Sequence, residues 1–406
     1  MLHRPVFYAL LCSWYCAASL NFPPTSLNFP ADINHGLSLP TKRALIVAHG
    51  GASGMLPENT LPAFKLAVEQ GADILECDVS LTRDLHLVCL DEPWLTDVTD
   101  VTRKFPAERK NTQYIPDIRK TFTDYFSMDF TLEELKTLKV KQRHDTRDYN
   151  HNNMYEIASL DEVLSLMKNS KRPLGVYVET KHPEWVNTLM ADRNQSSLEQ
   201  LLVDKLKSYG CSSKTDPCLI QSFSLESLER LKGLTSLPLV VLLDGMEVSD
   251  EELDEWSQFC YAIAPWKGLI VETMGDRQID RVTELVQKAH KHGLKVHPFT
   301  FKNDGNMPWD YGQDPYQEYK HFLSLGVDGF FTDYPLTLSH FLNVTYRPTP
   351  SADKSCKKQQ NTPSAETSSS YSISYSIGLA SGNSSSCVFT LLSLFIALSM
   401  PSTYLR

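Results

Sequence analysis

Residues 48–95 read "AHGGASGMLPENTLPAFKLAVEQGADILECDVSLTRDLHLVCLDEPWL", and this stretch sets the pattern of the whole fold. An apolar run at 44–49 leads into a glycine-rich turn. The segment 59–71 then has helical spacing, with Asn59 as the expected N-cap, and a second apolar run follows at 74–81. A strand, a helix and a second strand in this order are typical of a βαβ unit with parallel strands.

The same alternation continues through most of the chain. Strands are expected at 44–49, 74–81, 85–90, 174–180, 218–223, 238–243, 261–265, 294–300 and 328–333. Helices are expected at 59–71 and near 196–209, 224–233, 278–292 and 315–325. Most of the strands are continuous apolar runs, which favour a parallel sheet covered on both faces. A doubly wound sheet is the rival, but the first strand lacks the GxGxxG fingerprint, so we expect an α/β fold, a (β/α)₈ TIM barrel.

One interval breaks this rhythm, at about residues 92–158. It is polar and rich in Thr, Asp, Tyr and Lys, with one short helical piece, TLEELKTLK, at 131–139. A loop of this length without structure is unusual. We therefore expect a small subdomain, inserted after the second barrel strand on the top face of a barrel that spans residues 44–342.

Composition limits the class of partner. The chain has 406 residues and a formal net charge of −10, whereas nucleic-acid binding requires a basic face. We expect no nucleic-acid partner. An anionic substrate would have to be attracted by a local feature such as a metal ion.

Both ends of the chain carry targeting patterns. Residues 1–18 have a basic start, an apolar run and small residues, which is typical of a secretory signal peptide; a buried N-terminal helix is the alternative. Residues 347–386 form a Ser/Thr/Pro-rich stalk, and the apolar tail 387–406 follows. This order predicts a GPI-type anchor at the extracellular face of the cell membrane, with a plain tail anchor as the rival.

Secretion agrees with two smaller features. Glycosylation sequons begin at Asn194, Asn343 and Asn383. Six of the nine cysteines lie outside the two terminal signals, and Cys211 and Cys218 bracket a short loop and are the first expected disulfide.

The candidate chemistry lies where the expected strands end. His49 ends the first strand, and Glu76 and Asp78 lie near the end of the second. Glu179 ends the strand at 174–180, and Lys181 follows it with the same parity. Strand residues two apart face the same side, so these groups should converge at the top of the barrel.

Three converging carboxylates repel one another unless a cation neutralises them. A hard divalent ion, Mg²⁺ or Ca²⁺, prefers oxygen ligands and keeps positions for water and phosphate. The alternative is that these acids are solvated strand ends. Because three acids, a histidine and a lysine share one edge, we expect a metal site.

The motifs of this region resemble those of the glycerophosphodiester phosphodiesterases. The resemblance rests on residues 48–84 and on the pieces VETKHP (178–183), QSFSLESL (221–228), VHPFTFKND (296–304) and GVDGFFTDYP (326–335). It covers roughly residues 44–342. It implies a (β/α)₈ barrel with a subdomain after the second barrel strand, and metal-dependent hydrolysis of a small phosphodiester to glycerol 3-phosphate and an alcohol.

The resemblance also implies a role for each matching residue. Glu76, Asp78 and Glu179 would bind the metal, and His49 would be one of two histidines that act as acid and base. Glu58, in the Pro-Glu-Asn-Thr piece, and Lys181 would contact the substrate.

The sequence departs from the family pattern at two positions. Gly50 stands where the family has an arginine, and Asp91 stands where it has the second histidine. Asp91 either is protonated in a dry, acidic site or becomes a further metal ligand. The competing interpretation is a catalytically impaired relative that acts as a binding or surface-organising module.

An aromatic loop is a further candidate. Trp309, Tyr311 and Tyr316 lie within residues 306–319, after the seventh expected barrel strand. They would cover a choline-like head group through cation–π contacts, or they simply pack the loop.

Overall fold

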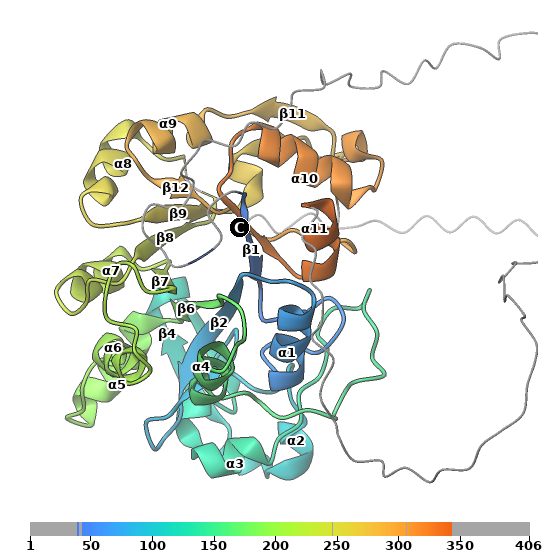
Figure 1. The fold of residues 1–406 in the computed structure, drawn as a ribbon. Helices are drawn as coiled ribbons and strands as arrows, with labels where there is room; N and C mark the ends of the chain where they lie inside the picture. Colours follow the sequence, from blue (N-terminus) through green and yellow to red (C-terminus); the bar gives the residue numbers. More distant parts are fainter. Residues whose placement is uncertain (1–38, 40–42, 246, 306, 343–406) are drawn as a thin grey trace, which may run out of the picture. The chain divides into compact units, whose positions relative to one another are not determined.

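Eight parallel strands form a nearly closed barrel in the computed structural model, which describes residue 39 and residues 43–245, 247–305 and 307–342 (Figure 1). The strands are β1 (Leu45–Ala48), β2 (Ile74–Leu81), β6 (Gly175–Thr180), β7 (Cys218–Ser222), β8 (Leu239–Leu243), β9 (Ala262–Pro265), β12 (Lys295–Val296) and β13 (Gly329–Thr332). They are hydrogen-bonded in the order β12-β9-β8-β7-β6-β2-β1-β13, and a bridge from Phe301 to Thr332 brings the chain after β12 beside β13. The predicted (β/α)₈ barrel is confirmed.

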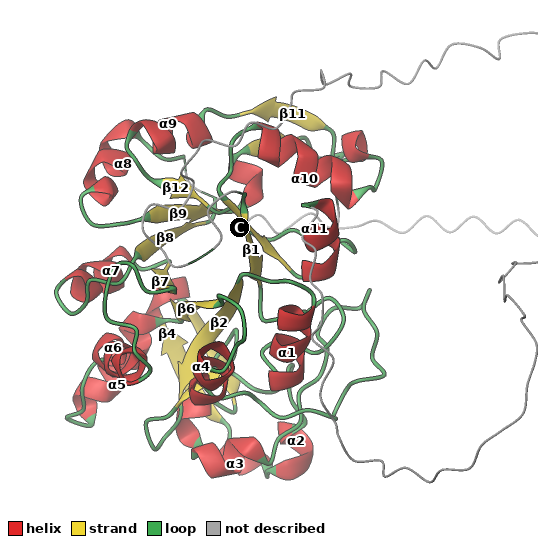
Figure 2. Ribbon diagram, in the orientation of Figure 1, coloured by secondary structure: helices red, strands yellow, loops and turns green. Residues whose placement is uncertain are grey.

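Helices surround the strands (Figure 2). They are α1 (Leu61–Glu69), α4 (Leu160–Lys168), α5 (Pro183–Asp192), α6 (Leu198–Ser208), α7 (Leu225–Lys232), α8 (Asp250–Ser257), α9 (Leu285–Lys291), α10 (Pro315–Ser324) and α11 (Pro335–Phe341). The expected N-cap of α1 is wrong by one residue, because the Thr60 hydroxyl accepts the Ala63 N–H. Asn59 instead takes a left-handed conformation and points its amide at Asp78.

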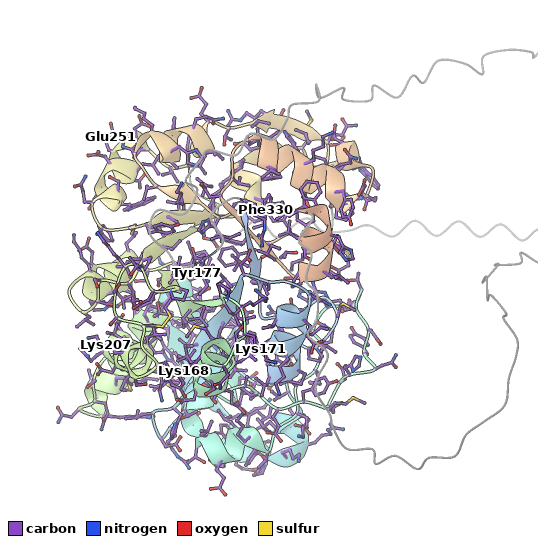
Figure 3. The ribbon with its side chains drawn as sticks, viewed as in Figure 1. Lys168, Lys171, Tyr177, Lys207, Glu251 and Phe330 are labelled. Atoms are coloured by element: carbon purple, nitrogen blue, oxygen red, sulfur yellow. A yellow bond between two sulfur atoms is a disulfide. The ribbon has the colours of Figure 1, made fainter. Side chains whose placement is uncertain are left out.

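The barrel core has two apolar layers that follow the period of two along each strand. Leu45 and Val47 belong to the interior cluster, whereas Ile46 packs in the shell between strands and helices. Tyr177 of the interior and Phe330 of the shell are both fully buried near the centre of Figure 3, whereas Lys207 of α6 and Glu251 of α8 lie at its left edge. Every polar side chain that faces inward must therefore find a partner or meet the open top of the barrel.

The expected strand at 85–90 is present but lies outside the parallel barrel. The run at 85–90 forms β3 (Leu87–Cys89), which pairs antiparallel with β2. A tight turn, with Leu85 in the left-handed region, reverses the chain after β2, whereas a parallel crossover needs a dozen or more residues. The return brings the Leu90 N–H to the Asp78 carbonyl, so the residue after it lies beside the strand that carries Glu76 and Asp78.

The segment between β3 and α4 has a core of its own. It contains α2 (Val101–Lys104), β4 (Asn111–Ile115), β5 (Lys120–Asp124) and α3 (Leu132–Lys136), with three short 3₁₀ helices. Tyr125, Phe130 and Leu135 pack in its apolar cluster. The expected helix at 131–139 is present as α3, but the β4–β5 hairpin was not predicted because its residues are mostly exposed and carry little apolar pattern.

A second expectation fails at 278–292. The helix there begins only at Leu285, and the preceding residues form β11 (Ile279–Val282), which pairs antiparallel with β10 (Val271–Thr273). Residues of β11 are mostly exposed, so burial did not impose a helical period on them.

Two disulfides connect described cysteines. The expected Cys211–Cys218 pair is confirmed, and Cys77–Cys89 joins β2 to β3. The second pair was missed because the antiparallel return of β3 was missed.

The predictions for the two ends of the chain are the signal peptide, the stalk and the anchor signal. The signal peptide at 1–18, the stalk and the anchor signal lie outside the described residues. Within the part that is described, no helix is long and apolar enough to cross a membrane.

Candidate active site

The upper ends of β1, β2 and β6 bring the expected acids together. Glu76 and Asp78 face the barrel interior from β2, and Asp78 pairs in register with Glu179 on β6. One carboxylate oxygen of each of these three residues lies within 4.8 Å of the others. All three residues are buried. The period of two therefore places three acids at one point, as the sequence predicted.

Burial and mutual repulsion disfavour the ionised forms of these carboxylates. Burial first, and the charge of Asp78 second, raise the pKa of Glu76 to about 8. Burial also raises the pKa of Glu179 well above its usual range, and Lys181 only partly opposes this. Three neighbouring carboxylates repel one another when all are ionised, and a divalent cation that binds their oxygens offsets this repulsion. The triad can therefore hold one metal ion.

Neighbouring donors fix the acids in place. The Lys181 Nζ lies 3.1 Å from Glu179 Oε1 and 3.8 Å from Asp78 Oδ1. The Gln221 side-chain amide donates to Glu76 Oε1 at 3.1 Å, and the Gly50 N–H donates to Glu76 Oε2 at 2.9 Å. Gly50 adopts φ +59°, where a side chain would be strained, and its backbone serves the acid directly.

His49 contacts an acid that follows the neighbouring strand β13. Its Nδ1 lies 2.8 Å from Asp333 Oδ1, just after β13. Burial alone would lower the pKa of His49, but the hydrogen bond and charge of Asp333, with the charges of Glu76 and Asp78, raise it to about 10. The hydrogen bond at Nδ1 leaves Nε2 as the nitrogen that can exchange a proton with a ligand.

Asp91 forms ion pairs with two cations. Its carboxylate contacts Arg143 Nη1 and lies 3.5 Å from Lys181 Nζ. Burial by itself would raise the pKa of Asp91, but Lys181 and Arg143 hold it well below its usual range. The same guanidinium reaches Glu58, whose Oε1 lies 2.9 Å from Arg143 Nε. Burial outweighs that contact and raises the pKa of Glu58 to about 7.

Comparison with known proteins agrees with this arrangement. Residues 49–337 match the sequence model of the glycerophosphoryl diester phosphodiesterase family. The chain belongs to this family. Glycerophosphodiester phosphodiesterase GDPD6 of Arabidopsis thaliana is 35% identical over 337 residues, which cover 77% of this chain and 90% of that protein. A glycerophosphodiester phosphodiesterase of Haemophilus influenzae is 27% identical over 343 residues, covering 73% and 89%.

Solved structures share the fold. A glycerophosphoryl diester phosphodiesterase assigned in Silicibacter pomeroyi has a TM-score of 0.55 at 20% identity, covering 74% of this chain and 93% of that one. A phosphodiesterase from Oleispira antarctica, solved with the product sn-glycerol-3-phosphate, has a TM-score of 0.51 at 20% identity, covering 75% and 97%. Family membership places the chain in the phosphodiesterase class of enzymes.

In this member of the family, the surroundings of Asp91 favour an ionised carboxylate paired with two cations, and its two expected roles stay predictions. Its low pKa argues against a protonated acid, and the described residues that could share a metal are Glu76, Asp78 and Glu179 without it. The physical reason is the pair of cations, since Lys181 and Arg143 favour the ionised carboxylate.

Three histidines that lie in or beside the strands of the phosphodiesterase barrel do not replace the missing one. His86 is exposed beside the turn between β2 and β3, as expected of the wrong end of the strand. His182 caps α5, and its Nε2 lies 2.7 Å from Glu92. His297 is buried in the barrel interior with its Nδ1 3.2 Å from the Tyr177 hydroxyl.

The aromatic loop divides between exposure and packing. Tyr311 is buried, and Trp309 stacks against Arg277 at 4.0 Å from the ring centroid. Tyr316 lies on α10 and packs against Phe341. Packing therefore accounts for Tyr311, whereas Trp309 and Tyr316 are exposed and the head-group cover stays a prediction for them.

Several residues of the phosphodiesterase site were not singled out from the sequence. Gln221 faces inward near the end of β7, and its parity with the buried Leu219 could have revealed it. Asp333 lies in a quoted motif without a predicted role. Arg143 had no signal at all, because it comes from the inserted segment, whose path over the barrel only the tertiary structure determines.

Proposed function

We propose that this protein is a metal-dependent hydrolase that cleaves glycerophosphodiesters to glycerol 3-phosphate and an alcohol. The observation that carries the proposal is the convergence of three buried carboxylates within 4.8 Å at the barrel mouth. The Oleispira antarctica phosphodiesterase holds sn-glycerol-3-phosphate on the same fold, which supports the same product class here.

In the proposed site, one set of residues binds the metal and another acts on the substrate. Glu76, Asp78 and Glu179 would hold Mg²⁺ or Ca²⁺, which when bound polarises the phosphate and offsets its charge. Lys181 supplies a positive charge between Glu179 and Asp91. Glu58 positions the Arg143 guanidinium beside the expected phosphate position.

His49 is the proposed proton donor to the leaving alkoxide. Its raised pKa keeps the imidazole protonated at neutral pH, and Asp333 fixes the ring through Nδ1. General acid catalysis of this kind contributes about 10²–10⁴-fold to rate. The family's second histidine is absent, and an ionised Asp91 cannot donate a proton in its place.

The ionised state of Asp91 also favours the second candidate, a catalytically impaired relative that binds ligands without turnover. Gly50 removes one family arginine, and Asp91 adds a negative charge near the expected phosphate position. The metal-binding acids support retained cation binding under either function.

One experiment separates the two functions. Purified protein is assayed on glycerophosphocholine with Mg²⁺, Ca²⁺ or EDTA, beside His49→Ala and the double variant Gly50→Arg/Asp91→His. We expect cation-dependent release of glycerol 3-phosphate that EDTA and His49→Ala abolish. An inert natural protein whose double variant turns over would establish the impaired relative instead.

We further propose that the protein is secreted and held at the outer cell surface by a GPI-type anchor. The terminal sequence patterns, the two disulfides and the exposed sequon residue Asn194 support this location. Release of the protein from intact cells by a phosphatidylinositol-specific phospholipase C is the expected result. Retention after that treatment would favour the plain tail anchor.

A further inference from the structure

Arg143 is an arginine that the inserted segment delivers to the mouth of the acidic site. Its Nε lies 2.9 Å from Glu58, and its Nη1 contacts Asp91. Neither contact uses Nη2, and the side chain is 30% exposed, compared with 12% for Lys181. A planar guanidinium with further donors and an open face can take an anionic ligand without leaving its carboxylate partners.

The backbone around Arg143 is anchored on both sides. The Gln142 side-chain amide donates to the Ser53 carbonyl at 3.1 Å, and Arg147 Nη1 donates to the same oxygen at 3.1 Å. Arg147 also pairs with Asp304 at 2.8 Å and with Asp333. Residues 142–147 are therefore clamped to the loops that follow β1, β12 and β13, which fixes Arg143 before any ligand arrives.

Two negative side chains at the mouth of the site make a cation such as Arg143 necessary for phosphate binding. Glu58 and Asp91 lie outside the metal-binding triad and would repel a phosphate. Gly50, beside His49, offers no side chain to counter them. Arg143 contacts both of these outer acids at once, so it is placed to convert a repulsive edge into an attractive one.

We infer that Arg143 is the phosphate-binding guanidinium of this protein, supplied by the inserted segment where the first barrel loop has Gly50. Asp91 and Glu58 act as positioning residues that orient its fork. The inference deepens the proposed function and rests on it for the identity of the substrate, but it concerns binding of the phosphate group itself.

The test compares Arg143→Ala, Arg143→Lys and Arg103→Ala with the natural protein at a fixed Mg²⁺ concentration. Arg103 is a matched control because it lies in the same inserted segment, pairs with Asp100 at 3.4 Å and is 65% exposed. The dissociation constants of inorganic phosphate and glycerol 3-phosphate are measured by calorimetry, with kcat and KM on glycerophosphocholine and the unfolding midpoint in urea.

We expect Arg143→Ala to weaken binding of both anions by about 10- to 100-fold, as for loss of a charge-assisted hydrogen bond. Arg143→Lys should be intermediate, because it keeps the charge and loses the fork, and Arg103→Ala should stay within about twofold of the natural protein. The unfolding midpoint of the lysine variant reports whether the fold is intact.

Two outcomes would overturn the inference: anion binding by Arg143→Ala within twofold of the natural protein, or an equal loss in the Arg103→Ala control. Failure of the proposed function looks different. In that case the natural protein would leave glycerophosphocholine intact while still binding inorganic phosphate in a manner that depends on Arg143, which supports the inference.

Discussion

Removal of the Cys77–Cys89 disulfide should lower both stability and activity, whereas removal of Cys211–Cys218 should lower stability alone. Cys77 lies between Glu76 and Asp78 of the acid triad, and Cys89 lies two residues before Asp91. The bond therefore joins two parts of the site. Cys218 begins β7 at the end of the barrel opposite the mouth, so its bond to Cys211 contacts no site residue.

The stability losses can be estimated from the closed loops. The sequence separations are 12 residues for Cys77–Cys89 and 7 for Cys211–Cys218. Restoring the chain entropy of the unfolded state costs about 3 kcal/mol for the first pair and about 2.5 kcal/mol for the second. Alanine replacements avoid burying a hydroxyl group, and all four cysteines are buried, so cavity effects should be similar in the two double variants.

The activity difference follows from the position of β3. Only three residues of β3 pair with β2, so without the disulfide Asp91 and its partner Arg143 gain freedom to move relative to the acid triad. A displacement of about 1 Å at such a site costs roughly 100-fold in rate. We expect kcat/KM on glycerophosphocholine to fall by about 10- to 100-fold in Cys77→Ala/Cys89→Ala and to stay within about twofold in the other double variant.

Urea unfolding and steady-state kinetics on both double variants decide the matter. If the two pairs reduce the free energy of unfolding comparably and leave kcat/KM equally unchanged, the disulfide between β2 and β3 has no part in positioning the site.

Three further perturbations test other parts of the structure. A divalent cation at about 100 times its dissociation constant should raise the free energy of unfolding by about 2.7 kcal/mol. In urea unfolding with Mg²⁺ or Ca²⁺, Glu179→Gln should abolish this gain. An unchanged gain in the variant would show that Glu179 is not a ligand. Burial lowers the pKa of His297 to about 4 from an ordinary 6.5, so between these values the unfolded chain binds a proton that the folded chain does not, and stability should fall as pH falls. His297→Gln should lose less stability between pH 7 and pH 5 than the natural protein, and equal losses would contradict the assignment. Arg147→Ala removes one cation from the buried Asp333, which keeps His49 at 2.8 Å and Lys302 at 3.7 Å, and it should cost about 1–3 kcal/mol in urea unfolding. The kcat should also fall because Asp333 orients His49, and a loss below about 1 kcal/mol would show that Arg147 is dispensable.

Strands were easier to predict than the segments between them. Burial on both faces makes β1 and β8 continuous apolar runs, and the barrel follows from the repetition of such strands. The β4–β5 and β10–β11 hairpins are mostly exposed, so solvent imposes no apolar period on them. The direction of β3 depended on a tight turn around Leu85, whose left-handed conformation has no glycine or asparagine to signal it.

The sequence by itself determined the acid triad, because strand parity and the barrel rule place Glu76, Asp78 and Glu179 on one edge whatever the loops do. Only the tertiary structure decided the charge state of Asp91. That charge state depends on Lys181 and on Arg143, which lies 52 residues after Asp91 in the chain. Arg143 reaches the mouth because residues 142–147 are anchored to Ser53, Asp304 and Asp333. A pKa is set by the charges within a few ångströms, and local sequence cannot reveal which distant segment folds into that distance.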